Sequence, residues 1–158
     1  MKPFEIRAPR SDELRRLAQL KIDWAGLDPR PGKGAEWAYA DELSAWMDRM
    51  GDRMLCRVAV MGDVLVGMGW LVVFERVPDF GDRRRKTGDL QSVYVTPGKR
   101  GHGIGLALVE ALCAEADRRG VARLTVHAST PAIELYEAAG FRTGATLLDR
   151  SNPEPPEG

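Results

Sequence analysis

Apolar residues alternate with polar ones in some parts of the chain and recur every three to four positions in others, which predicts both strands and helices. Runs rich in β-forming residues predict strands over 4–7, 54–61, 64–75, 89–95, 123–128 and 146–150. Gly62 and Asp63 separate the second run from the third, a spacing typical of a β-hairpin. Helical periodicity predicts helices from Ser11 to about Trp24, over 35–50, from Gly103 to Gly120 and over 131–139.

The helix predicted over 35–50 has one apolar stripe and an aromatic residue outside it. The stripe consists of Tyr39, Leu43, Trp46, Met47 and Met50. At about 100° per residue, Trp37 falls nearly opposite this stripe. We therefore expect Trp37 to be exposed or to line a site rather than to join the core.

The order of the predicted elements is strand, two helices, three strands, helix, strand, helix, strand. This order predicts an α+β fold with a mixed, mostly antiparallel central sheet flanked by four helices. The strand over 89–95, the helix after it and the strand over 123–128 should form one parallel, right-handed βαβ unit. We expect residues 1–150 to form a single domain and residues 151–158, which include three prolines, to form a flexible tail.

Composition and charge limit the classes of partner. The 158 residues are 44% hydrophobic and 29% charged, close to the average of globular proteins. Lys plus Arg and Asp plus Glu number 23 each, so no global positive field favours nucleic acid or anionic lipid. No apolar run approaches the roughly 20 residues of a membrane span, and residues 1–6 lack a signal core. We expect a cytoplasmic protein without membrane or nucleic-acid partners, and the isolated Cys56 and Cys113 predict no metal site.

A glycine-rich segment lies between the strand over 89–95 and the next helix: Arg100, Gly101, His102, Gly103, Ile104 and Gly105. Alternate glycines let backbone N–H groups turn toward one point at the positive end of the helix, which favours an anion. A nucleoside-triphosphate loop requires lysine where Ile104 stands. A dinucleotide loop requires a third glycine where Leu106 or Leu108 stands. Both nucleotide patterns therefore fail.

The segment resembles the acyl-CoA loop of the GNAT (N-acetyltransferase) superfamily, whose pattern Arg100, Gly103 and Gly105 match. A second family motif is similar to Leu135 and Tyr136 followed by Gly140 and Phe141. That motif usually opens with Asn, whereas this chain has Ser129, which weakens one expected hydrogen bond to the coenzyme. The resemblance implies a GNAT-like sheet of six to seven strands and acetyl-CoA as cosubstrate.

The resemblance also implies a coenzyme site and catalytic roles. Tyr136 would hydrogen-bond the coenzyme sulfur and protonate the departing thiolate, and a backbone N–H near Val95 would stabilise the oxyanion. The pantetheine would pair with the strand edge. The residues expected to bind the coenzyme are Val93, Tyr94, Val95, Arg100, Gly101, His102, Gly103, Ile104, Gly105, Leu106, Ser129 and Tyr136.

Other functional residues are less constrained by the sequence. Asp89 is a candidate general base or a simple strand-starting acid, and His127 is a second candidate. In the resembling family the first two helices and the loop between them cover the acceptor, so Trp24 and Trp37 are candidate acceptor-binding residues. The basic cluster over 83–86 is either a solvated loop or a contact for an acidic acceptor or partner.

We expect the protein to transfer an acetyl group from acetyl-CoA to a primary amine by direct attack on the thioester. The acceptor is a small-molecule amine or a peptide, and the sequence does not identify it. The resemblance also suggests a homodimer. The alternative is a non-catalytic acyl-CoA-binding or sensing domain that kept the loop and lost the chemistry.

Overall fold

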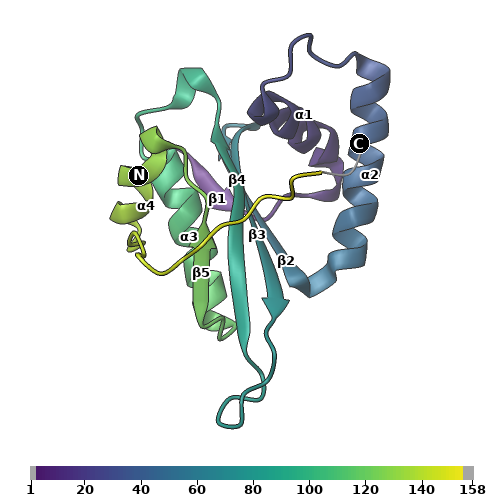
Figure 1. Ribbon diagram of the computed structural model, residues 1–158. Helices are drawn as coiled ribbons and strands as arrows, with labels where there is room; N and C mark the ends of the chain where they lie inside the picture. Colours follow the sequence, from purple (N-terminus) through teal and green to yellow (C-terminus); the bar gives the residue numbers. More distant parts are fainter. Residues whose placement is uncertain (1–2, 155–158) are drawn as a thin grey trace.

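The computed structural model describes residues 3–154 and places its strands in a single five-stranded sheet with the order β1-β2-β3-β4-β5. The strands are β1 (Glu5–Arg7), β2 (Met54–Met61), β3 (Val64–Glu75), β4 (Lys86–Val95) and β5 (Arg123–Val126). Neighbours from β1 to β4 pair antiparallel, whereas β4 and β5 pair parallel (Figure 1). The α+β class, the mixed and mostly antiparallel sheet and the parallel βαβ unit are thus confirmed.

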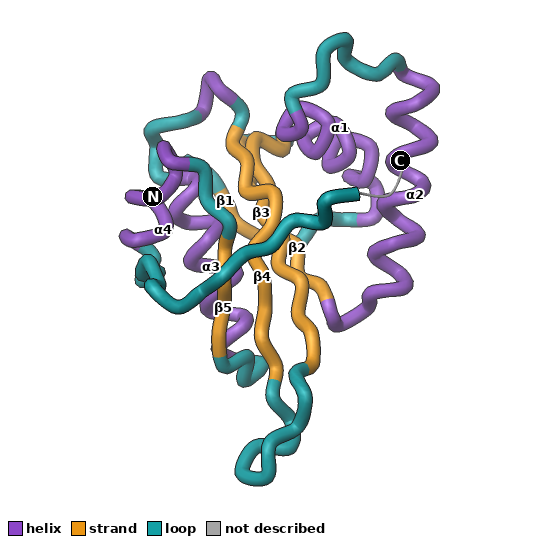
Figure 2. Tube along the Cα trace, in the orientation of Figure 1, coloured by secondary structure: helices purple, strands orange, loops and turns teal. Residues whose placement is uncertain are grey.

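Four α-helices flank the sheet, two on each face (Figure 2). They are α1 (Leu14–Ala25), α2 (Lys33–Met50), α3 (Ile104–Arg118) and α4 (Ile133–Ala138). The strands have a period of two, so adjacent residues of β3 face opposite layers. Trp70 packs into the core beneath α1 and α2, whereas Leu71 packs with Leu112 of α3 and Tyr136 of α4.

The predicted number of strands, six to seven, is wrong. Residues 146–150 form no strand and cross the molecule as a loop, which Figure 1 draws toward the yellow end of the chain. Leu147 and Leu148 are 71% and 91% exposed. Two adjacent apolar residues point to opposite faces of a strand, so this segment offers no single buried face that would stabilise pairing.

Several element boundaries also differ from the prediction: β5 ends at Val126 rather than at residue 128, and α2 begins at Lys33 rather than at residue 35. β4 begins at Lys86 rather than Asp89, because the polar residues Lys86 and Thr87 pair through their backbones with Glu75 and Phe74 of β3. The helix predicted from Ser11 begins with a short 3-10 turn, Ser11–Glu13, and α1 follows from Leu14. The Glu13 carboxylate accepts the Arg10 backbone N–H at 2.7 Å. Backbone pairing thus extends β4 beyond its apolar residues, and the Glu13 side chain bonds the backbone at the start of the first helical segment.

A buried carboxylate ties α1, α2 and their connection together. Glu36 is only 7% exposed, and its Oε1 accepts a hydrogen bond from Gln19 Nε2 at 2.6 Å. Its Oε2 lies 3.4 Å from Arg30, which also contacts Asp23. Because a buried charge is stable only when paired and hydrogen-bonded, this network ties α1 to α2 and to the connection between them.

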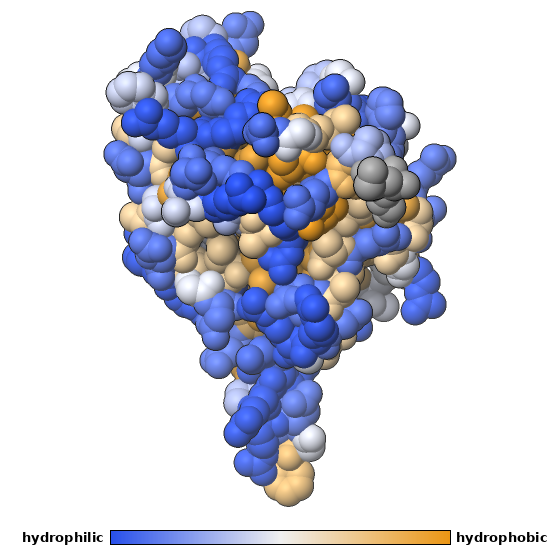
Figure 3. Space-filling view, turned by 180° about the vertical axis from the view of Figure 1, so that it is seen from behind, coloured by the Kyte–Doolittle hydropathy of each residue, from blue (hydrophilic) through white to orange (hydrophobic). Residues whose placement is uncertain are grey.

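The β3–β4 connection, residues 76–85, projects from the body as an arm (Figure 3). Its surface is mostly hydrophilic, and Phe80 at the arm is 93% exposed beneath the Arg83 guanidinium. None of the described helices is both long and apolar enough to cross a membrane. Of the predicted tail over 151–158, residues 151–154 lack regular structure and residues 155–158 lie outside the described part.

Candidate functional site

A β-bulge interrupts β4 near its centre. Trp70 pairs with Gln91 and Met68 with Tyr94, so two residues of β4, Ser92 and Val93, lie opposite a single residue of β3. Ser92 has a φ of 55°, which is uncommon for a residue other than glycine. The bulge therefore bends β4 and re-aims the side chain of Ser92.

Beyond the bulge, one edge of β4 is free of strand pairing in the described part of the chain. The parallel ladder with β5 ends at Leu90 and Val126. On the other side of β4, the Thr96 N–H donates to the Val66 carbonyl at 2.9 Å. Since successive N–H groups of a strand point in opposite directions, the N–H groups of Val93 and Val95 point toward the free edge.

The glycine loop, residues 100–105, follows residues 91–95, which are called the free half of β4 because β5 does not pair with them. Gly101 and Gly103 have φ values of 79° and 80°, which side chains other than glycine adopt only with strain. α3 starts at Ile104, and the Ala107 N–H donates to the Gly103 carbonyl at 3.1 Å. The N–H groups of Ile104, Gly105 and Leu106 precede this first helical bond and form the positive end of α3. The arrangement suits an anion.

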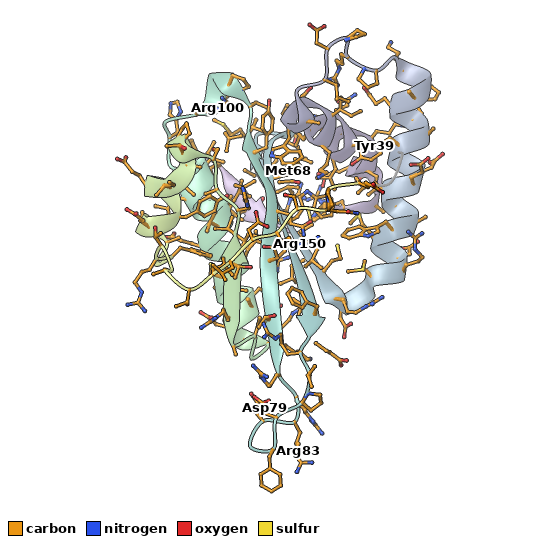
Figure 4. All side chains as sticks on the ribbon, viewed as in Figure 1. Tyr39, Met68, Asp79, Arg83, Arg100 and Arg150 are labelled. Atoms are coloured by element: carbon orange, nitrogen blue, oxygen red, sulfur yellow. The ribbon has the colours of Figure 1, made fainter. Side chains whose placement is uncertain are left out.

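Side chains of the loop hold it against β4. Arg100 Nε donates to the Val95 carbonyl at 2.8 Å, and its guanidinium carbon lies 5.4 Å from the centre of the Tyr94 ring. The ring of His102 faces the backbone, with Nδ1 2.9 Å from the Arg100 carbonyl oxygen. Figure 4 shows Arg100 at the end of the sheet where β4 leaves it. The exposed Arg100 thus adds a positive charge between the loop and the free edge.

Tyr136 lies on α4 and belongs to the apolar cluster between the sheet and α3. It is 8% exposed, and its ring meets Phe141 edge to face with centroids 5.7 Å apart. Val93 of the free half of β4 packs into the same apolar cluster. Burial raises the pKa of the Tyr136 hydroxyl above its ordinary value of 10.0, so this group is protonated at neutral pH. A protonated phenol can act as a general acid.

α4 packs closely on the glycine loop, and the segment before α4 begins at Ser129. A Cβ at Gly105 would lie 2.8 Å from Leu135 Cδ1, so the small residue allows close contact between α3 and α4. Ser129 is exposed, and its carbonyl accepts the Ala132 N–H at 2.9 Å. The structure therefore places the glycine loop, Ser129 and Tyr136 on the α3 and α4 side of the sheet.

Asp89 is partly buried where β4 still pairs with β5. Its Oδ1 accepts a hydrogen bond from Thr125 Oγ1 at 3.1 Å, and its Oδ2 accepts one from Gln91 Nε2 at 3.1 Å. His127 follows the last residue of β5 and is exposed. Both oxygens of Asp89 therefore have partners, which gives this carboxylate a structural role in addition to the predicted catalytic one.

A cavity of about 370 Å³ lies between the helical layer of α1 and α2 and the bulged part of the sheet. Lys21 of α1 and Ser92 of β4 both line it, and Figure 4 marks Tyr39, another lining residue, on the α2 side. The lining residues are Lys21, Tyr39, Glu42, Leu43, Trp46, Arg49, Trp70, Gln91 and Ser92. The cavity and the glycine loop thus approach β4 from different sides.

A second cavity of about 330 Å³ lies beside the first and shares Lys21 and Tyr39 with it. Trp24 lines this second cavity, whereas Trp37 is not among the lining residues of either. Trp37 is 50% exposed, and the Arg15 guanidinium carbon lies 4.3 Å from the centre of its ring. The two predicted acceptor-binding tryptophans therefore occupy different surfaces.

Sequence reasoning missed Lys21. A signal was present, because Lys21 follows Leu14 by seven residues and Leu17 by four and so lies on the buried stripe of α1. A cation on an apolar stripe indicates either a buried ion pair or a binding site.

No group of three or more His, Cys, Asp or Glu side chains within residues 3–154 is close enough together to hold a metal ion.

Comparison with known proteins identifies the family. The model of the acetyltransferase (GNAT) family matches residues 18–141. A glucosamine 6-phosphate N-acetyltransferase of Trypanosoma brucei brucei is 34% identical over 65 residues, which are 41% of this chain and 44% of that protein. The chain thus matches less than half the length of this curated relative.

Solved structures share the fold. A predicted acetyltransferase from Clostridium acetobutylicum, crystallised with acetyl-CoA, superposes with a TM-score of 0.72 at 16% identity, covering 94% of this chain and 96% of that one. Glucosamine-6-phosphate N-acetyltransferase from Arabidopsis thaliana gives a TM-score of 0.72 at 19% identity, covering 94% and 97%. Because the family match runs from α1 through the glycine loop to Phe141, this protein belongs to the acetyltransferase (GNAT) family.

Proposed function

We propose that the protein is an N-acetyltransferase that moves the acetyl group of acetyl-CoA to a primary amine of a small molecule. The observation that carries the proposal is the free half of β4, which ends at the positive start of α3 on one side and borders the cavity at Ser92 on the other. A coenzyme and an acceptor can thus approach the same stretch of backbone. The Clostridium relative crystallised with acetyl-CoA supports the choice of coenzyme.

The coenzyme would bind by two backbone interactions. Its pyrophosphate would accept hydrogen bonds from the N–H groups at the start of α3, with Arg100 adding charge. Its pantetheine would lie along the free edge as an added strand, paired with Val93 and Val95. This placement brings the thioester to the bulge, where β4 and the cavity meet.

The reaction then follows by direct attack. The neutral amine forms a bond to the thioester carbon, and the carbonyl oxygen becomes an oxyanion that the Val95 N–H stabilises. The carbon–sulfur bond then breaks, the amide forms, and the thiolate takes a proton from Tyr136. The proton lost by the amine passes to a base, for which Asp89, acting through water, is our candidate.

The role of Asp89 is testable without disturbing the strand pairing. Asp89→Asn keeps the shape and retains an acceptor for Thr125. If Asp89 is the base, this variant should lose about 10²-fold or more in kcat/KM. An unchanged kcat/KM with an unfolding midpoint close to the wild type would assign Asp89 a structural role only.

Glucosamine 6-phosphate is the first acceptor to test, because it is named for relatives in both Trypanosoma and Arabidopsis. The cavity of about 370 Å³ is within the usual size range of small-molecule sites. The acceptor of this chain is nevertheless an independent question, since a shared fold does not fix the substrate.

The competing function is a non-catalytic acyl-CoA-binding domain. Calorimetric titration with acetyl-CoA should show one saturable site, and thiol release should then appear with at least one member of a panel of primary amines. Binding without thiol release across the panel would favour the sensing function. A homodimer and a cytoplasmic location stay predictions.

A further inference from the structure

Lys21 is a cation in the cavity of about 370 Å³, the proposed acceptor site, which is called the acceptor-side cavity below. It is partly buried on α1, and its Nζ donates a hydrogen bond to Ser92 Oγ at 2.6 Å. The same Nζ lies 4.7 Å from the centre of the Trp24 ring. A hydroxyl on one side and an aromatic face on the other therefore fix the position of the ammonium.

The ammonium has no acidic partner in the described part of the chain. No Asp or Glu oxygen there lies within 4.0 Å of Lys21 Nζ, the limit for an ion pair. By contrast, Arg30 pairs with Asp23 and Glu36, and Arg57 pairs with Glu115. Burial lowers the pKa of Lys21, as expected for an ammonium taken partly out of water without a counter-ion. An uncompensated charge of this kind is costly unless a ligand supplies the opposite charge.

The rest of the cavity is consistent with an anionic ligand of small size. Arg49 of α2 lines the same cavity. It follows Tyr39 by ten residues, so the two positions lie about 15 Å apart along the helix axis. Glu42 is the acidic side chain in the lining, so the two cations outnumber it. Trp46 and Trp70, with ring centroids 6.0 Å apart, supply an apolar wall.

We infer that the acceptor is an amine that also carries an anionic group, a carboxylate or a phosphate, and that Lys21 binds this group. The inference rests on the proposed function and names the substrate class of the same site. Because Ser92 belongs to the bulge of β4, the anion bound at Lys21 lies near the free edge where the thioester would be. The anionic group and the reacting amine are therefore parts of one compact molecule.

The test compares amines that differ only in the anionic group. Glucosamine and glucosamine 6-phosphate form one pair, and tyramine and tyrosine form the other. Thiol release from acetyl-CoA gives kcat/KM for each amine with wild type, Lys21→Met and Lys21→Arg. Lys33→Met is the matched control, since Lys33 is exposed at the start of α2 and outside the lining of both cavities.

We expect the wild type to prefer the anionic member of at least one pair. Lys21→Met should lower kcat/KM for that anionic amine by about 10- to 100-fold, the usual value of a hydrogen-bonded charge, and leave its neutral partner within about twofold. Lys21→Arg should retain part of the preference. Lys33→Met should match the wild type.

Direct binding separates this inference from the proposed function. The four amines are titrated by calorimetry into protein saturated with CoA, so no turnover is needed, and acetyl-CoA affinity checks that each variant folds. Anion-dependent binding that Lys21→Met abolishes supports the inference even if no amine is acetylated. The inference would be overturned if the wild type used neutral and anionic amines equally, or if it bound neither anionic amine. Equal losses for both amines in Lys21→Met would also overturn it, since that result would indicate a general base.

Discussion

Lys21 Nζ and Ser92 Oγ, 2.6 Å apart, join α1 to the bulge of β4 across 71 residues of sequence. Ser92 can accept this bond because its φ of 55° turns it out of the regular strand. The bond links the wall of the acceptor-side cavity to the stretch of backbone that is free of β5. This hydrogen bond therefore links the two halves of the candidate site.

Ser92→Ala removes this bond while keeping a side chain with a similar cost at positive φ. The Lys21 ammonium then loses its fixed position, and we expect the KM of the acceptor to rise by roughly 3- to 10-fold. Acetyl-CoA affinity, measured by calorimetry, should be unchanged because the glycine loop is untouched. A change confined to coenzyme affinity would contradict the assigned role.

Tyr136→Phe should slow turnover by about 10²-fold or more while sparing acetyl-CoA affinity, since only the acidic proton is lost. The ring retains its edge-to-face contact with Phe141, so the variant should unfold close to the wild-type midpoint. Because burial raises the pKa of Tyr136 above 10.0, the acid form persists through neutral pH. The loss of activity from its ionisation should therefore appear only above about pH 10 in the pH profile.

Gly103→Ala should weaken acetyl-CoA binding. Its φ of 80° would cost alanine about 1–2 kcal/mol and would tilt the N–H groups at the start of α3. Gly98→Ala is the matched control, because Gly98 is open to solvent and its φ lies outside the strained range. Calorimetry should give about 10-fold weaker binding for the first variant and no change for the second.

The Arg7 and Glu13 pair should make stability depend on acid pH. Arg7 donates two hydrogen bonds to the Glu13 carboxylate, at 2.9 and 2.6 Å, and this partner lowers the pKa of Glu13 from 4.5 to about 2. A carboxylate whose pKa is lower in the folded than in the unfolded state stabilises the fold at pH values above its unfolded pKa. This stabilisation is lost as the pH falls through the folded pKa. Wild type should therefore lose stability between about pH 4.5 and 2, whereas Glu13→Gln should start about 1–2 kcal/mol lower and lose less. Urea unfolding of both proteins across this range tests the difference, and parallel curves would refute it.

The two exposed tryptophans should behave differently. Trp24 lines the second cavity and lies against Lys21, so Trp24→Leu should raise the acceptor KM by several-fold. Trp37 lies against Arg15 and lines neither cavity, so Trp37→Leu should leave the acceptor KM unchanged. Steady-state kinetics of both variants with the same amine would test this difference. A higher acceptor KM in both variants would support the expectation from sequence that both tryptophans bind the acceptor.

Features that depend only on neighbouring residues could be predicted before the fold was known. The hairpin at Gly62 and Asp63, the turn at Gly101 and Gly103 and the helix that follows need only local backbone preferences, which short stretches of sequence encode. The same holds for Tyr136 and Phe141, whose spacing lies within one short helix and its end. Local chemistry was thus enough to predict the glycine loop and the helix that carries Tyr136.

Long-range packing sets the point at which β4 loses its partner β5 and the side chains that meet at the cavity. Residues 146–150 have strand-like composition but no partner that buries one face, so pairing failed where composition suggested it. Lys21 and Ser92 are distant in sequence, and their contact depends on how α1 crosses the sheet and on a bulge that shifts the register of β4. The contact between Lys21 and Ser92 could not be predicted from a short motif, because packing between layers brings these side chains together.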